Sequence, residues 1–288
     1  MFMLPQPNDG FAWVQASAGP ALVCRALEPA ASHLFTTRGW SLGSRTAGEA
    51  DDGWGQVAAA LDVDAASLVR SHQVHGAAVL VRRAGQADAS PDGSVSRGRP
   101  DADIIVSNDS DAALAIQTAD CVPLLLADRR TGVVAAAHAG WRGLAARVPA
   151  VAVDALAREF GSRPEDLVAA AGPSISASRY EVGIEVRGSF EHAGCSTAQL
   201  ARWFSPAARS EHFYFDGWAA VRDQLESAGV PTGQIHVAAL CTATYPALFC
   251  SYRRDGTPAG RMAAVVRARL TSSQPHPSPR SPADPRAR

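Results

Sequence analysis

Residues 118–148 read TADCVPLLLADRRTGVVAAAHAGWRGLAARV, two short apolar runs joined by a polar turn. The runs cover 124–127 and 133–137, and the turn covers 128–132. This spacing is typical of a hairpin of well-buried strands. An antiparallel hairpin places the start of one strand beside the end of the other, so we expect Cys121 and His138 at the same end. A thiol and an imidazole placed together can serve as a metal-binding pair or as a nucleophile and its base.

The residues that flank Cys121 and His138 favour a functional site over a structural role in the core. A buried cysteine commonly acts as a small hydrophobic residue, which is the structural alternative for Cys121. However, Asp120 precedes the thiol, and Gly140, Trp141, Arg142 and Gly143 follow the histidine. Glycine suits a tight turn where the backbone approaches a ligand. The sequence therefore predicts a functional site at this end of the hairpin.

The composition describes an ordinary globular protein, with 47% apolar and 19% charged residues in a chain of 288. A net charge of −1 gives no electrostatic footprint for nucleic acid or an anionic membrane, so we expect neither as a partner. The amino terminus lacks a signal-peptide pattern, and no apolar run reaches the roughly 18 residues of a spanning helix. The five cysteines form no paired framework, which favours a reducing cytoplasm with metal-binding or catalytic thiols. The oligomeric state is left open.

Apolar patterning predicts further elements on both sides of the hairpin. We expect edge strands within 11–40, further strands at 77–82, 101–107 and 234–240, and helices near 56–61, 144–160 and 218–225. Pro149 implies that the 144–160 helix either starts late or is kinked, and Gly161 is a plausible end. A single domain is predicted over 1–270, followed by a disordered tail rich in Pro, Ser and Arg over 271–288.

His75 is the natural third member of the site, because Gly76 beside it would allow a close approach to a ligand. His72 is expected to be a surface or loop residue. The remaining histidines of the predicted domain have no nearby chemistry; they are His33, His192, His212 and His236.

Short motifs spread along the chain together resemble the laccase-domain family, which is also described as peptidoglycan editing factor, polyphenol oxidase and purine nucleoside phosphorylase. The motifs are QVHG at 73–76, TADCVP at 118–123, HAGWRG at 138–143, GPSI at 172–175, YEVG at 180–183 and SYRRDG at 251–256. The resemblance implies an α+β fold, a single-domain four-layer α/β/β/α sandwich with mixed β-sheets. It also implies a zinc ion on His75, Cys121 and His138. The implied reactions are phosphorolysis of adenosine, inosine, guanosine or methylthioadenosine, and adenosine deamination.

The chain departs from the family pattern in three places. Gly39-Trp40-Ser41 stands where the family has Gly-Gly-Val-Ser, no Asn-Arg pair follows 49–53, and His72 replaces the usual Asn before Gln73. These departures lie on the substrate side and leave the metal triplet intact.

Two imidazoles and a thiolate around Zn²⁺ leave one coordination position open, as catalytic zinc requires. Arg38, Arg142 and Arg253 are candidates to clamp a phosphate, and a surface ion pair with Asp255 is the alternative for Arg253 and Arg254. Asp103 and Asp120 either orient the metal histidines, hold the ribose or base, or cap the mouth of the hairpin. The predicted catalytic residues are Cys121, His138, Asp120 and Arg142, and the predicted substrate-binding residues are Arg38, Gln73, Asp103 and Arg253.

Three other functional classes remain open. Without a metal, Cys121 and His138 would form a nucleophile–base pair in a hydrolase or amidase that edits peptidoglycan precursors. A copper-dependent polyphenol oxidase is disfavoured, because Met262 is the only internal methionine for an axial ligand and the histidines are scattered singly. A zinc-stabilised binding protein without activity is disfavoured by the open coordination position.

Overall fold

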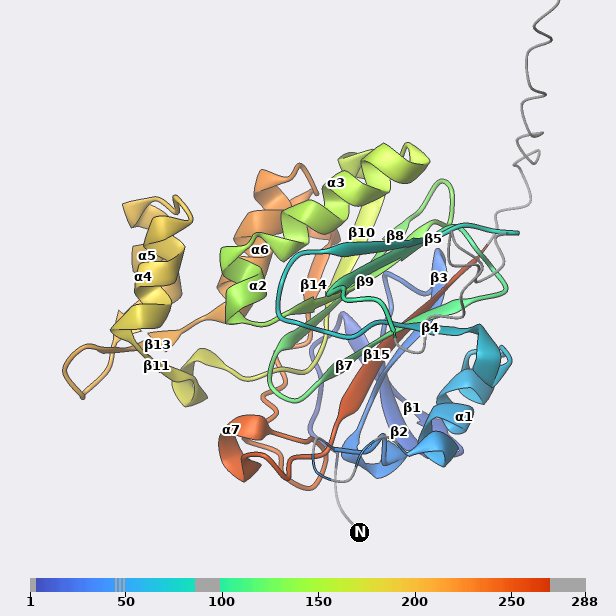
Figure 1. Ribbon diagram of the computed structural model, residues 1–288, viewed down its shortest axis with the longest axis horizontal. Helices are drawn as coiled ribbons and strands as arrows, with labels where there is room; N and C mark the ends of the chain where they lie inside the picture. Colours follow the sequence, from blue (N-terminus) through green and yellow to red (C-terminus); the bar gives the residue numbers. More distant parts are fainter. Residues whose placement is uncertain (1–3, 45, 47, 49, 86–98, 270–288) are drawn as a thin grey trace, which may run out of the picture.

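The computed structural model describes residues 4–44, 46, 48, 50–85 and 99–269 (Figure 1). The predicted tail at 271–288 lies outside these residues. Two six-stranded sheets form the centre of the molecule. None of the described helices combines the length and the apolar character needed to cross a bilayer.

The first sheet has the order β1-β2-β3-β15-β7-β4 and is antiparallel except for the parallel pair β4–β7. Its strands are β1 Phe11–Ala16, β2 Gly19–Cys24, β3 Ala31–Thr36, β15 Met262–Ala268, β7 Ala113–Thr118 and β4 Leu68–Arg70. Only β1 of the three amino-terminal strands is an edge strand, since β2 and β3 lie inside the sheet. The expectation of edge strands throughout 11–40 is therefore wrong for β2 and β3.

The second sheet has the order β14-β10-β8-β9-β6-β5 and is mixed. Its strands are β14 Ile235–Val237, β10 Leu167–Ala171, β8 Val122–Asp128, β9 Val134–Ala139, β6 Ile104–Ser107 and β5 Val79–Arg82. The predicted hairpin is β8 and β9, paired antiparallel with Pro123 opposite His138. The strands predicted at 101–107 and 234–240 are shorter than expected. Residues 101–103 lie outside β6, and residues 234 and 238–240 lie outside β14.

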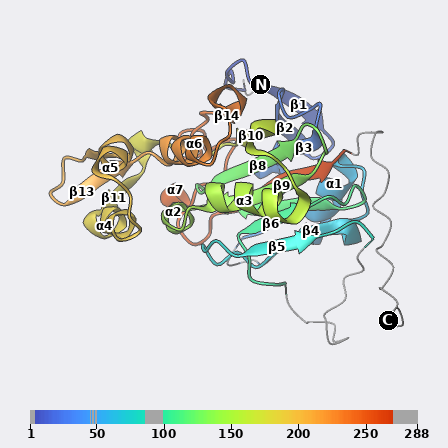
Figure 2. The same cartoon turned by 90° about the horizontal axis from the view of Figure 1, so that it is seen from above.

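Helices cover the outer face of each sheet. Helix α1 Asp51–Ala60 packs on the first sheet through Trp54 and Val57. Helices α2 Trp141–Ala145, α3 Val148–Phe160 and α6 Gly217–Ser227 pack on the second sheet. Figure 2 shows α3 lying across the strands of that sheet. The four-layer α/β/β/α arrangement is therefore confirmed.

The strands of the second sheet are apolar on both faces because each face is covered. Ile104, Leu124 and Leu126 point toward the helices, whereas Ile105 and Leu125 point toward the first sheet. Two covered faces explain why these strands read as continuous apolar runs without alternation.

The predicted helix at 144–160 is two helices. Helix α2 ends at Ala145, and Arg147 adopts a left-handed backbone with φ of 61° before α3 begins at Val148. Pro149 lies in the first turn of α3, where a missing N–H costs nothing, and Gly161 ends the helix with φ of 69°. Pro149 therefore marks a late start of the helix and not a kink within it. Helix α1 begins several residues before the predicted start near 56.

A small third sheet stands apart at one end of the sandwich (Figures 1 and 2). Its strands are β11 Glu181–Gly183, β13 His212–Phe215 and β12 Phe204–Pro206, with helices α4 Ile184–His192 and α5 Thr197–Trp203 beside them. Rings of Phe190, Phe204 and Phe215 pack together within it. The sequence analysis did not predict this unit. The short helix α7 Tyr252–Asp255 contributes residues to the wall of the cavity described below. Single 3₁₀ turns occupy Arg38–Trp40, Ala65–Ser67, Pro164–Asp166, Ala177–Arg179 and Thr232–Gln234.

Candidate active site

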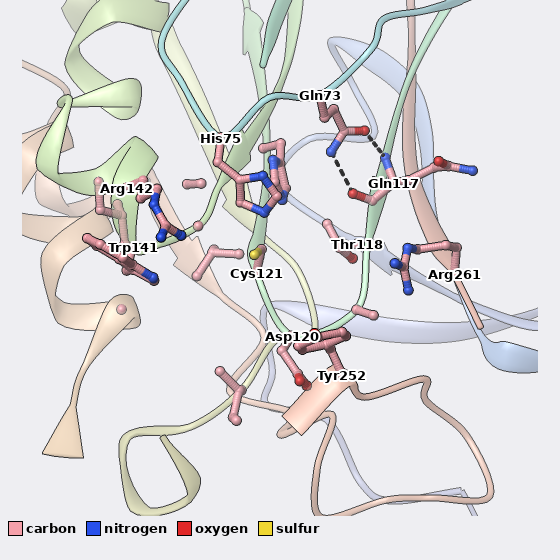
Figure 3. A pocket seen from close by; sticks show the side chains of 18 of the residues that line it. Gln73, His75, Gln117, Thr118, Asp120, Cys121, Trp141, Arg142, Tyr252 and Arg261 are labelled. Atoms are coloured by element: carbon pink, nitrogen blue, oxygen red, sulfur yellow. Dashed lines mark hydrogen bonds between the residues drawn. The ribbon is translucent and has the colours of Figure 1, made fainter. Parts of the chain in front are cut away.

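His75, Cys121 and His138 come together at one end of the second sheet. Their potential metal-ligand atoms all lie within 4.8 Å of one another. The centroids of the two imidazole rings are 4.8 Å apart, and the ring planes meet at 78°. Cys121 immediately precedes β8, and His138 lies near the end of β9, as the hairpin predicts. His75 arrives from the segment between β4 and β5 (Figure 3). His138 is buried, Cys121 is half-buried and His75 is exposed, so the cluster is open on one side.

A single carboxylate organises both histidines. Asp103 accepts hydrogen bonds from the backbone N–H groups of Val74 at 3.1 Å, His75 at 3.0 Å and Gly76 at 2.7 Å. It also accepts one from Nδ1 of His138 at 2.8 Å, which leaves Nε2 of that ring as the free ligand atom. His75 has a φ of 62°, a strained value for this residue that the bonded turn sustains.

Asp103 is fully buried and does not line the cavity, so the predicted contact with substrate is corrected to a contact with His138. Of the roles considered for this residue, orientation of a metal histidine is the one that fits its position. Gly140 lies directly against the cluster. A Cβ atom there would stand 2.9 Å from Sγ of Cys121 and 3.2 Å from the His75 ring, so a larger residue would have to displace these side chains.

Cys121 and His138 shift each other's pKa values in opposite directions. Burial of the Cys121 thiol would raise its pKa, but His138 and His75 beside it lower that pKa to about 6. Burial opposes charge on His138 as well, yet the Cys121 thiolate and Asp103 raise its pKa to about 9. A thiolate and two imidazole nitrogens form a donor set that zinc accepts in proteins.

The cluster opens into a cavity of about 1300 Å³. Figure 3 shows Trp141 and Arg142 on one side of His75 and Cys121, with Gln117, Thr118 and Arg261 on the other. Basic residues dominate the charge of the described wall: they are Arg99, Arg142, Arg253 and Arg261, against the single carboxylate of Asp120. The cavity therefore favours an anionic ligand.

Two of these arginines rest on aromatic rings. The guanidinium of Arg142 lies 4.2 Å from the centre of the Trp141 ring, and that of Arg253 lies 5.1 Å from the centre of the Tyr180 ring. A ring beneath the guanidinium leaves its N–H edge available to a ligand. The ion pair with Asp255 that was considered for Arg253 and Arg254 is made by Arg254, at 2.6 Å.

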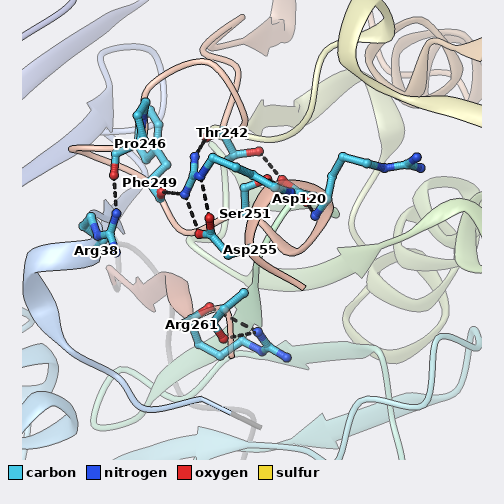
Figure 4. Close-up of polar contacts among 12 residues, drawn as sticks. Arg38, Asp120, Thr242, Pro246, Phe249, Ser251, Asp255 and Arg261 are labelled. Atoms are coloured by element: carbon cyan, nitrogen blue, oxygen red, sulfur yellow. Dashed lines mark hydrogen bonds and ion pairs between the residues drawn. The ribbon is translucent and has the colours of Figure 1, made fainter. Parts of the chain in front are cut away.

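Three other predicted residues use their polar atoms within the protein. The amide of Gln73 bonds both the N–H and the carbonyl of Gln117, at 2.7 and 2.8 Å, and so fastens its loop to β7. The carboxylate of Asp120 is shared among three donors from two distant segments. Arg38 lies outside the cavity lining and donates to the carbonyl of Pro246 (Figure 4).

The sequence analysis did not single out several residues of the cavity wall. These are Arg99, Thr118, Tyr180, Phe215, Tyr252 and Arg261. Thr118, Tyr180 and Tyr252 lie inside motifs quoted above, and those motifs were the signal that could have identified them. Arg99, Phe215 and Arg261 lie outside every quoted motif. His72 is an exposed loop residue paired with Asp101 at 2.7 Å, as expected.

Comparison with known proteins identifies the family of the chain. The chain matches the family described as multi-copper polyphenol oxidoreductase laccase over residues 50–269. A purine nucleoside phosphorylase of Deinococcus radiodurans is 37% identical over 84% of this chain and 91% of its own length. An adenosine deaminase, RL5, from an unknown prokaryotic organism is 34% identical over 70% of this chain and 76% of its own.

Among solved structures, YlmD of Geobacillus stearothermophilus has a TM-score of 0.75 at 27% identity, covering 89% of this chain and 98% of its own. The resemblance inferred from the motifs is thereby confirmed. The chain belongs to the multi-copper polyphenol oxidoreductase laccase family, whose relatives include proteins named purine nucleoside phosphorylase and adenosine deaminase.

Proposed function

We propose that this chain is a zinc-dependent enzyme that cleaves purine nucleosides by phosphorolysis, with adenosine deamination as a second reaction of the same site. The observation that carries the proposal is the His75–Cys121–His138 cluster at the wall of an arginine-lined cavity. The names of the relatives supply the substrate class, purine nucleosides including adenosine. The family resemblance adds inosine, guanosine and methylthioadenosine as candidates.

His75, Cys121 and His138 would hold the zinc ion, which supplies a Lewis-acid centre of residual positive charge. Copper is the less favourable occupant. The one internal methionine, Met262, is buried in the core between the sheets and does not line the cavity. A blue-copper site would need such a weak axial ligand.

The protein side chains position the reactants. In phosphorolysis the glycosidic bond breaks through a positively charged, oxocarbenium-like state, so positioning and charge stabilisation do most of the work. Arg142 and Arg253 would hold phosphate through their N–H edges while Trp141 and Tyr180 fix the guanidinium planes. Deamination needs a group that moves protons. Asp120 is the one carboxylate of the described wall, and its hydrogen bonds within the protein make it a poor candidate, which favours phosphorolysis.

Metal analysis of the purified protein, followed by turnover, tests the proposal. We expect about one zinc per chain, by analogy with other three-ligand catalytic sites. His75→Ala, Cys121→Ala and His138→Ala should each lose most of it. His72→Ala is the matched control, because this exposed histidine pairs with Asp101 close to the cluster but is not part of it. Full zinc retention by Cys121→Ala would remove the metal hypothesis.

The purified enzyme is then incubated with inosine or adenosine and phosphate, and the products are separated by chromatography. Free base with ribose 1-phosphate identifies phosphorolysis, and inosine formed from adenosine without phosphate identifies deamination. Arg142→Lys keeps the charge but loses the planar fork, so it should raise the phosphate KM more than the nucleoside KM. An unchanged phosphate KM would assign Arg142 to structure.

A second candidate is a metal-independent cysteine hydrolase or amidase that edits peptidoglycan precursors. The lowered pKa of Cys121, about 6, favours it, because a thiolate is the reactive form of a cysteine nucleophile. A protein that purifies without metal and loses activity on thiol alkylation would support this candidate over the first. Either enzyme is proposed to act in the cytoplasm, since all five cysteines are free thiols.

A further inference from the structure

Asp120 has a positive backbone φ angle, and its carboxylate accepts three hydrogen bonds. Its φ is 89°, a conformation that residues other than glycine rarely adopt. Its buried carboxylate accepts hydrogen bonds from Oγ1 of Thr242 at 2.6 Å, Oγ of Ser251 at 3.1 Å and the backbone N–H of Arg253 at 2.6 Å (Figure 4). Such strain persists only where the surroundings over-determine the conformation.

These bonds join parts of the chain that are far apart in the sequence. Asp120 immediately precedes the candidate metal ligand Cys121, and Arg253 lies 133 residues further on, in the first turn of α7. The carboxylate thus fastens the start of β8 to the segment that carries one of the two ring-stacked arginines. Ser251 adds to the connection, because it bonds Asp120 and also caps α7.

The side chain of Arg253 is held from the other end by Tyr180. Its guanidinium lies 5.1 Å from the centre of that ring, and within the described residues it makes no hydrogen bond or ion pair. The backbone is therefore fixed by Asp120 and the plane of the guanidinium by Tyr180. What remains available is the N–H edge, in the wall of the cavity.

We propose that Asp120 is a positioning residue that places Arg253 for binding the anionic co-substrate, and that it transfers no proton in the reaction. This inference rests on the proposed function, in which the cavity binds phosphate. It predicts that loss of the Asp120 carboxylate acts on phosphate binding through Arg253 alone. It also changes the catalytic role that the sequence suggested for Asp120.

Four variants test the inference. Asp120→Gly removes the carboxylate and also suits the positive φ, so it adds no backbone strain. Asp120→Asn keeps the size and one acceptor oxygen. Arg253→Ala removes the proposed anion contact, and the double variant Asp120→Gly/Arg253→Ala completes a cycle. Asp109→Asn is the matched control. Asp109 is likewise buried and hydrogen-bonded, but it lies outside the cavity lining.

We expect Asp120→Gly and Arg253→Ala each to raise the phosphate KM about tenfold, the size of losing one charged hydrogen bond. The double variant should match Arg253→Ala within about threefold, because the two changes remove one interaction. At saturating phosphate and nucleoside, kcat should fall less than about threefold in Asp120→Asn. Asp109→Asn should lower the melting midpoint without changing the phosphate KM.

Two results would overturn the inference: effects of Asp120→Gly and Arg253→Ala that multiply in the double variant, or a loss of kcat in Asp120→Asn with the phosphate KM unchanged. Calorimetric titration with inorganic phosphate separates this inference from the proposed reaction. If nucleosides prove not to be substrates, equal weakening of phosphate binding in Asp120→Gly and Arg253→Ala still supports the positioning role. Unchanged phosphate binding in both variants rejects it.

Discussion

At the scale of single residues, Gly140 sets how closely the backbone can approach the candidate metal ligands. It follows β9 with an ordinary φ of −74°, so the demand for glycine here is steric. The added methyl of Gly140→Ala would stand 2.9 Å from Sγ of Cys121 and 3.2 Å from Cδ2 of His75. We expect zinc affinity to fall by about 10–100-fold, as when other residues that orient metal ligands are changed.

Competition with a chromophoric chelator measures that affinity. Gly55→Ala is the control, because a Cβ atom at this position in α1 meets nothing within 4 Å. It should keep the zinc and raise the free energy of unfolding by up to about 1 kcal/mol. Wild-type zinc affinity in Gly140→Ala would show that Cys121 and His75 can move aside without losing the metal.

At the scale of secondary-structure elements, His33 completes the contact between β2 and β3. The ladder between these strands pairs only Ala21 with Thr36 and Leu22 with Phe35. Beyond it, the N–H of Cys24 donates to Nε2 of His33 at 2.8 Å, and Nδ1 of the ring faces the carbonyl of Ala31 at 3.3 Å. The ring is therefore neutral in the folded protein, because its Nε2 must accept.

Burial is the main reason that the pKa of His33 is lowered to about 4, and Arg269 adds to it. The unfolded chain binds a proton near pH 6.5 and the folded chain does not, so stability is present above pH 6.5 and is lost as pH falls toward 4. Between pH 7 and pH 5 we expect the free energy of unfolding to decrease by about 2 kcal/mol from this group.

Urea unfolding at the two pH values, in wild type and in His33→Gln, isolates the contribution of His33. The variant lacks the titrating ring, so its stability should change less between pH 7 and pH 5. An equal change in both proteins would mean that His33 does not titrate in this range.

At the scale of the whole molecule, Gly172 fixes the distance between the two sheets near the site. It follows β10 of the second sheet, and its N–H donates to the carbonyl of Pro123 at 2.9 Å. A Cβ atom on Gly172 would stand 2.2 Å from Cδ1 of Phe35, which belongs to β3 of the first sheet. Because both sheets are stiff, the added methyl cannot be accommodated by a small shift.

We expect Gly172→Ala to lower the free energy of unfolding by about 1–3 kcal/mol, the usual cost of overpacking a core. Phe35→Leu removes the ring carbons in question, so the double variant Gly172→Ala/Phe35→Leu should be more stable than the sum of the two single changes predicts. Chemical unfolding of the four proteins measures this coupling. Additive effects would place the strain elsewhere than between Gly172 and Phe35.

The sequence alone determined the hairpin of β8 and β9, the meeting of Cys121 with His138 and, through its motifs, the four-layer fold. Hairpin pairing depends on apolar runs and a turn that are adjacent in the chain, so local sequence is sufficient to specify it. The motif around His75 and its neighbouring glycine also predicted that this histidine joins Cys121 and His138 in space, which the structure shows. The small third sheet with α4 and α5 was missed because its strands are three or four residues long and carry little periodicity.

Only the tertiary structure decided where the remaining candidate site residues lie and what they contact. Asp103 and Asp120 are alike in sequence, each a carboxylate near an apolar strand. Folding buries Asp103 behind His138 and joins Asp120 to Arg253. Arg38 and Arg261 are likewise indistinguishable by residue type, yet Arg261 lines the cavity and Arg38 does not. The physical reason is that a side chain's role depends on which donors, rings and charges surround it. Those neighbours lie up to 208 residues away in the chain and meet only when the sheets pack.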